Sequence, residues 1–337
     1  MPACYTPAPM TVSRRGFLST LAVGPFLFSS ARAQAKAVPR VGVLSGLPSA
    51  DIRQALDTFR EELRKLGWTI NQNVTLLQVR SAEGRNERLP DLAAEVLNES
   101  PEVVVVLTAP ATRALQQLTA TVPIVMWGVG DPVEYGLVAN LVRPGANVTG
   151  TSALVNEVAG KLVELLREVA PGAGSCAVFS NPGNAGAGPY SRAAQTAGQA
   201  LSIRVQSLEV RTPDDFDAAF GEIARQRLGA IIVPPEPLVR SQRRRVVDFA
   251  ARQCIPLLFH GPPGLLQSGG LLAFAAKAGH PRIVASYVDR ILKGARPAEL
   301  PVHQPTEFEL AVNVQTAKVL GLSIPRAVLV RADRIIE

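Results

Sequence analysis

Small and polar residues stand at several points where an apolar run of the sequence gives way to a turn. Hydroxyls and backbone N–H groups at such points can bind a carboxylate, and the acids among them can accept hydrogen bonds from an ammonium group. These candidate ligand-binding residues are Ser45, Gly46, Thr108, Ala109, Asp131, Asn181, Glu236 and His260. Together they indicate a site that binds a small molecule, and nothing in their spacing marks a catalytic set.

Several of these residues also have an ordinary structural interpretation. Thr108 could cap a helix that begins shortly after it, which is compatible with ligand contact. Asp131 and Asn181 each precede a proline and could simply form turns. Glu236 stands between two prolines and could lie at the rim of a site. His260 could be a partly buried imidazole whose hydrogen bonds are satisfied.

The elements that position these residues alternate regularly from residue 40 onward. Short apolar strands alternate with amphipathic helices, which is typical of a parallel sheet with helices on both faces. The run 103–107 contains five consecutive apolar residues and suits a strand buried on both faces. Strands are expected at 41–44, 74–79, 103–107, 123–127, 176–179, 205–208, 230–233 and 256–259. Ligands of such sheets bind beyond the carboxyl ends of the strands, where the candidates stand.

The alternation restarts after the turn-forming segment 144–150, so we predict an α/β fold with two doubly wound parallel-sheet lobes. Lobe 1 is expected to cover residues 38–149, and lobe 2 residues 150–270. Residues 271–337 contain one expected strand, and we expect them to return to lobe 1 and then form a multi-strand hinge and a C-terminal helix. A chain of 337 residues, 47% of them hydrophobic, can bury two cores, which excludes a mainly disordered protein.

Residues 1–33 have the features of an export signal. Arg14 and Arg15 precede an apolar stretch that ends at residue 28, and Ala31 and Ala33 follow it. Adjacent arginines are typical of twin-arginine signals, and small residues are typical of cleavage sites. An uncleaved N-terminal anchor is the alternative, but the apolar stretch is shorter than the ~20 residues that span a membrane. We therefore predict a twin-arginine signal cleaved after Ala33, and a mature protein in the periplasm.

The export signal also accounts for part of the positive charge. The whole chain carries a net charge of +7, whereas residues 34–337 have 32 basic and 28 acidic residues, a net charge of +4. The densest remaining basic run comprises Arg240, Arg243, Arg244 and Arg245. No aromatic residues are interleaved with it, so we interpret it as a solvated helix face and predict no nucleic-acid partner.

Motifs of the common enzyme and metal sites are missing from the sequence. It contains no G-x-G-x-x-G after a strand, no G-x-x-x-x-G-K-[ST] and no G-x-S-x-G. His260, His280 and His303 lack the spacing of metal ligands, as do Cys176 and Cys254. We therefore predict that the protein is not an enzyme and uses no metal or cofactor, with an unrecognised exported enzyme as the alternative.

A family resemblance runs along the chain in order. Its segments include FREELRKLG at 59–67, GDPVEYGLV at 130–138, RPGANVTG at 143–150, SQRRR at 241–245, ILKGA at 291–295 and AKVLGL at 317–322. They resemble the tryptophan/tyrosine-type ABC transporter substrate-binding proteins. The resemblance implies a type I periplasmic binding protein, a monomer whose two α/β lobes close on a small solute. Its partners would be a small-molecule ligand and an ABC permease in the inner membrane.

The resemblance also implies roles for individual residues. The segment that contains Asp131 falls in the interlobe cleft of the family, so this residue is expected to accept a hydrogen bond from a ligand amine. Where relatives commonly carry Ser-Tyr-Gly, this chain has Phe274 between two alanines, which keeps an aromatic face and loses a hydroxyl. We expect Ser45 and Thr108 to hold a carboxylate or other acceptor group, and Phe274, with Trp127, to be available for stacking.

Two further functions would suit a similar fold. One is a partner that presents its ligand to a membrane sensor, and the other is the core of a ligand-responsive transcription regulator. The regulator would need a helix-turn-helix segment, and an export signal stands in its place. We therefore predict an exported, non-catalytic solute receptor whose ligand is an amino acid or another aromatic or carboxylated solute.

Overall fold

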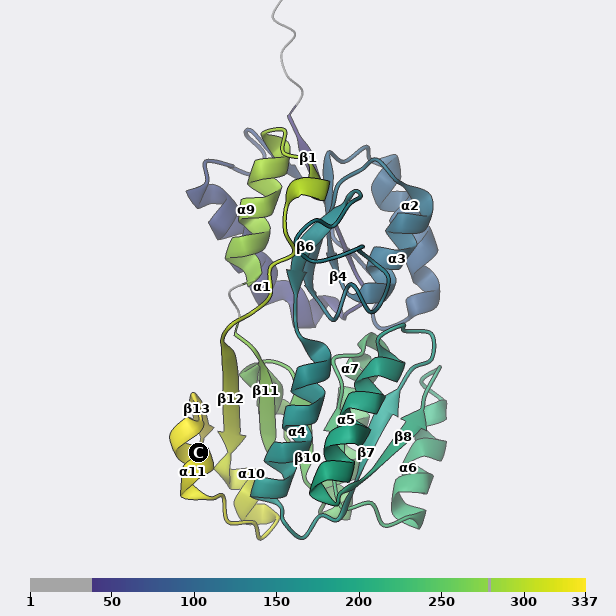
Figure 1. Cartoon of the computed structure of the whole chain (residues 1–337), viewed down its shortest axis with the longest axis vertical. Coiled ribbons are helices and arrows are strands. Elements are labelled where there is room, and N and C mark those ends of the chain that lie inside the picture. Colours follow the sequence, from purple (N-terminus) through teal and green to yellow (C-terminus); the bar gives the residue numbers. More distant parts are fainter. Residues whose placement is uncertain (1–37, 278–279) are drawn as a thin grey trace, which may run out of the picture. The chain divides into compact units, whose positions relative to one another are not determined.

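The structure, a computed structural model, describes residues 38–277 and 280–337. The predicted export signal and its cleavage site lie outside the described residues. Two sheets with helices on both faces make up the described part, one with six strands and one with seven (Figure 1). The predicted pair of doubly wound α/β sheets is therefore confirmed.

The first sheet is parallel and has the order β2-β1-β4-β5-β6, with β3 also paired to β1. Its strands are β1 (Arg40–Ser45), β2 (Thr75–Leu76), β3 (Arg80–Ser81), β4 (Val103–Leu107), β5 (Ile124–Val129) and β6 (Val148–Ser152). The single strand predicted at 74–79 is thus two short strands. The sequence also gave no indication of β6, because its residues are mostly small and polar and it is held by pairing with β5.

Four helices cover the first sheet, two on each face. The helices α1 (Ser49–Lys65) and α9 (His280–Leu292) pack together on one face, and α2 (Leu89–Asn98) and α3 (Ala109–Leu118) pack on the other. A short 3-10 helix, η1 (Asn86–Arg88), precedes α2. The end of α1 is set by Gly67, whose φ of +91° allows Trp68 N–H to donate back to the carbonyl of Leu63.

The second sheet has the order β13-β12-β11-β10-β9-β7-β8 and is parallel except for the β11–β12 pair. Its strands are β7 (Ser175–Ser180), β8 (Arg204–Glu209), β9 (Ile231–Val233), β10 (Leu257–His260), β11 (Leu272–Ala276), β12 (Phe308–Asn313) and β13 (Arg334–Ile336). Residues after 270 therefore contribute three strands to this sheet, where the sequence indicated one. The helix α9 lies between them in the sequence but packs against α1 on the first sheet.

Both faces of the second sheet are covered by helices. One face packs against α4 (Val155–Val169), α5 (Ala187–Leu201), α10 (Val314–Val319) and α11 (Arg326–Arg331). The other packs against α6 (Asp215–Arg225), α7 (Pro237–Ser241) and α8 (Arg243–Gln253). Phe220 and Phe249 stack with their ring centroids 4.4 Å apart between α6 and α8. The remaining 3-10 helices are η2 (Pro263–Ser268) and η3 (Pro297–Glu299).

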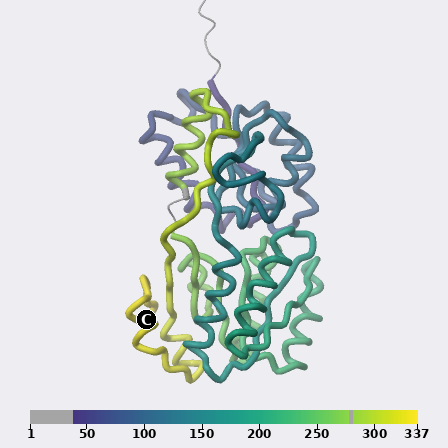
Figure 2. The backbone as a smooth tube through the Cα atoms, in the orientation of Figure 1, coloured from purple at the N-terminus to yellow at the C-terminus, as the bar shows by residue number. Residues whose placement is uncertain are grey.

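Two of the segments that connect the sheets are paired with each other. Ser152 N–H donates to the carbonyl of His303 over 2.8 Å, and His303 N–H donates to the carbonyl of Gly150 over 2.9 Å. The first segment leads from β6 into α4, and the second leads from η3 toward β12, so they run alongside one another between the sheets (Figure 2). In the part of the chain that the structure describes, no helix is both long and apolar enough to cross a bilayer.

Candidate functional site

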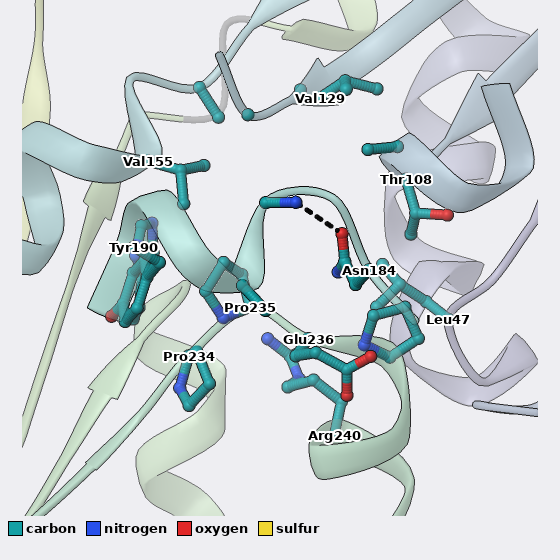
Figure 3. A pocket seen from close by; sticks show the side chains of 18 of the residues that line it. Leu47, Thr108, Val129, Val155, Asn184, Tyr190, Pro234, Pro235, Glu236 and Arg240 are labelled. Atoms are coloured by element: carbon teal, nitrogen blue, oxygen red, sulfur yellow. Dashed lines mark hydrogen bonds between the residues drawn. The ribbon is translucent and has the colours of Figure 1, made fainter. Parts of the chain in front are cut away.

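A cavity of about 150 Å³ lies at the positions in both sheets where a ligand is expected to bind. In the first sheet β1 is flanked by β2 and β4, and in the second β7 is flanked by β8 and β9, so the strand order reverses at these points. Ligands of doubly wound sheets bind beyond the carboxyl ends of the strands there. The cavity, called here the central pocket, is lined by residues in or after the carboxyl-terminal parts of β1, β4, β5, β6, β7, β9 and β10 (Figure 3).

Thr108 both caps a helix and lines the central pocket. Its Oγ1 accepts a hydrogen bond from Ala111 N–H over 3.4 Å at the start of α3, which confirms the capping interpretation. Its φ of +121° is strained for a residue that is not glycine, and such strain is concentrated at functional sites. A Cβ on Gly46 would lie 2.7 Å from this hydroxyl and 3.2 Å from Pro237, so glycine permits the close approach of the loops. Ala109, the next residue in the chain, also lines the pocket.

Glu236 is a buried wall of the pocket and does not lie at its rim. The side chain is 4% exposed; one oxygen accepts from Val239 N–H over 2.9 Å, and the other accepts from Asn181 Nδ2 over 3.1 Å. Burial raises the pKa of Glu236 to about 7, although these donors act in the opposite direction. Asn181 also forms the turn that its sequence indicated, because its Oδ1 accepts from Gly183 N–H. Asn181 lies behind Glu236 and is not itself part of the lining.

His260 lines the pocket with a nitrogen that lacks a partner. The residue is 4% exposed, and no described residue bonds its Nδ1. The described protein residues therefore supply no partner for this nitrogen of the imidazole. Burial, together with the positive charge of Arg240, lowers the pKa of His260 to about 3, so the ring is neutral. Tyr190 packs beside it at 5.7 Å between ring centroids, and its hydroxyl likewise has no partner within the described ranges.

Two arginines of the basic run hold an aspartate from the opposite sheet's helix layer. Arg240 lines the pocket and donates from Nε and Nη2 to Asp51 Oδ2 over 3.2 and 3.0 Å. Arg243 donates from Nη1 to Asp51 Oδ1 over 3.0 Å. The interpretation of a solvated helix face is thus wrong for these two arginines and holds for Arg244, whose side chain is 96% exposed.

Asp131 and Ser45 lie beside the pocket and outside its lining. Asp131 Oδ2 accepts from Asn156 N–H over 3.3 Å. Burial, followed by the nearby carboxylate of Glu157, raises the pKa of Asp131 to about 6. Ser45 is fully buried, and its hydroxyl accepts from Leu47 N–H over 3.0 Å, which holds the loop that brings Leu47 to the pocket.

The aromatic side chains of the pocket differ from those expected. Phe274 stacks on Phe308, with 5.6 Å between ring centroids, and is not among the lining residues. Trp127 does line the pocket, and it also contacts Phe59 in the core. Three aromatic residues that were not among the candidates also line the pocket, namely Tyr135, Phe179 and Tyr190.

The sequence does contain an indication that Tyr135 belongs to the site. This residue lies within the segment 130–138, and an added Cβ on Gly130 or Gly186 would come within 2.5 or 2.8 Å of its ring. Glycines on both sides of the pocket thus make room for this ring. For Tyr190, Arg240 and Asn184 we find no comparable signal, because each lies in or near a helix whose orientation depends on packing.

The pocket offers hydrogen-bonding groups and aromatic faces, which suits a small ligand. Among the described residues, no three His, Cys, Asp or Glu side chains gather in a way that could hold a metal ion. Residues 40–336 match the family model of the ABC transporter substrate binding proteins. The chain belongs to this family. Its members bind small ligands, and a substrate-binding protein needs the kind of pocket that the two sheets form here.

Relatives of this substrate-binding protein support the assignment. It is 22% identical over 298 residues to a tyrosine-binding protein of Clostridioides difficile, covering 86% of this chain and 83% of the relative. It resembles the solved structure of a conserved domain protein from Vibrio cholerae with a TM-score of 0.82 and 26% identity, over 88% of this chain and 99% of the other.

A further solved structure is an ABC domain in complex with L-Trp from Streptococcus pneumoniae. The TM-score is 0.82 at 22% identity, and the match covers 88% of this chain and 99% of the other. Together with more distant solute-binding neighbours, these structures establish the type I periplasmic binding fold that the sequence predicted.

Proposed function

We propose that the protein is the solute receptor of an ABC importer and captures a small, partly aromatic molecule in the central pocket. The observation that carries this proposal is the composition of the pocket wall. Thr108 and Trp127 come from the first sheet, and Glu236 and His260 come from the second. A ligand that contacts both sides favours the state in which the sheets close on it.

The ligand class that we propose follows from the wall and from the relatives. Trp127, Tyr135 and Tyr190 give aromatic faces, and Glu236 can accept a hydrogen bond from an amine. One relative is named for tyrosine binding, and another was solved with L-Trp. An aromatic amino acid or a related aromatic solute therefore heads the set to be tested, with Asp131 beside the pocket as a second acceptor for an amine.

The cellular setting belongs to the same proposal. A twin-arginine signal would take the folded protein to the periplasm and be cleaved after Ala33. There the monomer would deliver its solute to an inner-membrane permease, without a nucleic-acid partner, catalysis or a cofactor. The division into 38–149, 150–270 and 271–337 also stays a proposal, with the paired segments at Ser152 and His303 as part of the hinge.

A thermal-shift screen of the purified protein tests the proposal. The solutes are amino acids, aromatic acids, aromatic amines, purines and short peptides, with calorimetry of each hit. A ligand at 100 times its dissociation constant should add about 2.7 kcal/mol to the free energy of unfolding. Replacement of Trp127 by Ala should reduce the shift, whereas Trp68→Ala, outside the pocket lining, should not. Failure of every solute class to stabilise the protein would refute the receptor function.

A further inference from the structure

The guanidinium group of Arg240 has one nitrogen that its ion pair leaves free. Nε and Nη2 donate to Asp51, whereas no hydrogen bond found among the described residues uses Nη1. Nη1 lies against Gly261, where an added Cβ would come within 2.9 Å of it. The side chain is 7% exposed and forms part of the pocket wall next to Glu236 (Figure 3). An N–H of the pocket wall that has no acceptor in the protein is free to donate a charge-assisted hydrogen bond to a ligand oxygen.

The charges around Arg240 are not balanced. Asp51, 8% exposed, is the one carboxylate that pairs with both Arg240 and Arg243 in the described structure. This group of three side chains therefore carries a net positive charge. Glu236 is the acid among the lining residues, and burial raises its pKa to about 7, so it is only partly ionised near neutral pH. Buried charge that lacks a counter-ion favours an anionic ligand.

His260 supplies a second donor on the same wall. Its Nδ1 is buried and unpartnered within the described residues, and burial, together with the charge of Arg240, lowers the pKa of the ring and keeps it neutral. A neutral imidazole can carry its proton on Nδ1 and donate it. Arg240 Nη1 and His260 Nδ1 are thus two unused nitrogens in one pocket, which suits the two oxygens of a carboxylate.

We propose that Arg240 and His260 bind the carboxylate of an aromatic or otherwise apolar acid, and that Asp51 is the positioning residue for Arg240. This inference rests on the proposed function and assigns the polar end of the ligand. Asp51 lies in the first turn of α1, which covers the first sheet, whereas Arg240 lies in α7, on the second. The carboxylate site is therefore complete only when the two sides of the pocket are in contact, which couples recognition of the acid to closure.

Matched pairs of acids and amides test the proposal, because amidation removes the charge and almost preserves the shape. The pairs are benzoate and benzamide, indole-3-acetate and indole-3-acetamide, and L-tryptophan and L-tryptophanamide, each titrated by calorimetry into the full chain. We expect at least one acid to bind at least about tenfold more tightly than its amide. In Arg240→Gln this ratio should fall to nearly one. Arg244→Gln removes the same charge from an exposed side chain and should leave the ratio unchanged.

The positioning role of Asp51 has a separate readout. Asp51→Asn should lower the acid-to-amide ratio several-fold although it does not touch the ligand, and small-angle scattering should show a larger radius of gyration for the ligand-free variant. Asp57→Asn is the matched control, since this aspartate lies on the same helix with a 64% exposed side chain. A merely structural role of Asp51 would weaken acid and amide equally.

Each possible result of these titrations either supports or overturns the proposed carboxylate site. Equal binding of acids and amides by the wild type would overturn the proposal, as would an unchanged ratio in Arg240→Gln. If that variant does not fold, an unchanged ratio in Asp51→Asn overturns the positioning role. If only neutral or cationic solutes bind in the wider screen, the receptor function stands and the carboxylate site is wrong. If no solute of any class binds, the receptor function fails together with it.

Discussion

Asn181 donates from Nδ2 to Glu236 Oε1 over 3.1 Å, and this bond ties the loop after β7 to the loop after β9. Both side chains are almost fully buried. The bond and the N–H of Val239 favour the ionised carboxylate, but burial outweighs them and raises the pKa of Glu236 to about 7. A structural bond behind the pocket thus holds a group that titrates near neutral pH.

We expect Glu236→Gln to change how stability depends on pH. The pKa of about 7 in the folded protein exceeds the ordinary value of 4.5, so between these values the folded state holds the proton more tightly than the unfolded state. The contribution of Glu236 to the free energy of unfolding is therefore largest below pH 4.5 and declines as the pH rises to 7, by about 3 kcal/mol at most. Glutamine does not titrate.

Urea denaturation of both proteins between pH 4.5 and 8 measures this effect. The stability of Glu236→Gln relative to the wild type should rise from pH 4.5 to 7 and then level off. Glu61→Gln, at an exposed position outside the pocket lining, serves as the control. Parallel pH profiles for the wild type and Glu236→Gln would contradict the raised pKa.

Gly150→Ala should be among the most destabilising substitutions in β6. Gly150 has a φ of +131°, and an added Cβ would lie 2.1 Å from the carbonyl oxygen of Met126 in β5. We expect a loss of about 3 kcal/mol from backbone strain and the displaced strand. Gly221→Ala, in α6 with open space around it, should instead gain up to about 1 kcal/mol. Equal thermal stabilities of the two variants would contradict this explanation of β6.

Tyr190→Phe should leave the ligand-free protein as stable as the wild type or stabilise it by about 1 kcal/mol, because it removes a buried hydroxyl that has no partner. Tyr287→Phe is the comparison: its hydroxyl donates to the carbonyl of Pro301, and its loss should cost about 1 kcal/mol. Calorimetric unfolding of both variants measures the difference. A clear destabilisation by Tyr190→Phe would show that the hydroxyl does have a partner.

The two cysteines of the described part should differ sharply in reactivity. Cys176 is buried in β7, where desolvation raises the pKa of its thiol to about 12, whereas Cys254 is exposed at the end of α8. The thiolate is the reactive form, so iodoacetamide should modify Cys254 in the native protein and Cys176 only after denaturation. Peptide mass spectrometry after timed alkylation reads out both sites. Rapid native labelling of Cys176 would contradict its burial in the sheet.

The sequence indicated most strands because their apolar residues are consecutive. The run 103–107 became β4, buried throughout, and the ends of the predicted strands led to Thr108, Glu236 and His260 in the pocket lining. β6 and β13 are among the strands that the sequence did not indicate, for the opposite reason. The small residues of β6 and the exposed residues of β13 form strands through pairing with β5 and β12.

A second limit concerns where a predicted site residue points in the folded protein. It applies to Asp131, Asn181, Ser45 and Phe274. A residue at a strand end can face the ligand, the neighbouring loop or the core, and the order of the residues does not distinguish these outcomes. Asn181 supports Glu236, and Phe274 stacks on Phe308. Their contact with a ligand stays a prediction, and their observed partners are within the protein.

The sequence by itself determined the α/β alternation, the two doubly wound sheets and the strand ends at which a ligand site had to lie, because these follow from local apolar patterns. The tertiary structure alone decided which side chains form that site. Asp51 and Arg240 stand 189 residues apart and meet only because α1 and α7 approach each other across the pocket. Their charges could be read from the sequence, but the burial that makes the pairing strong depends on how the two sheets come together.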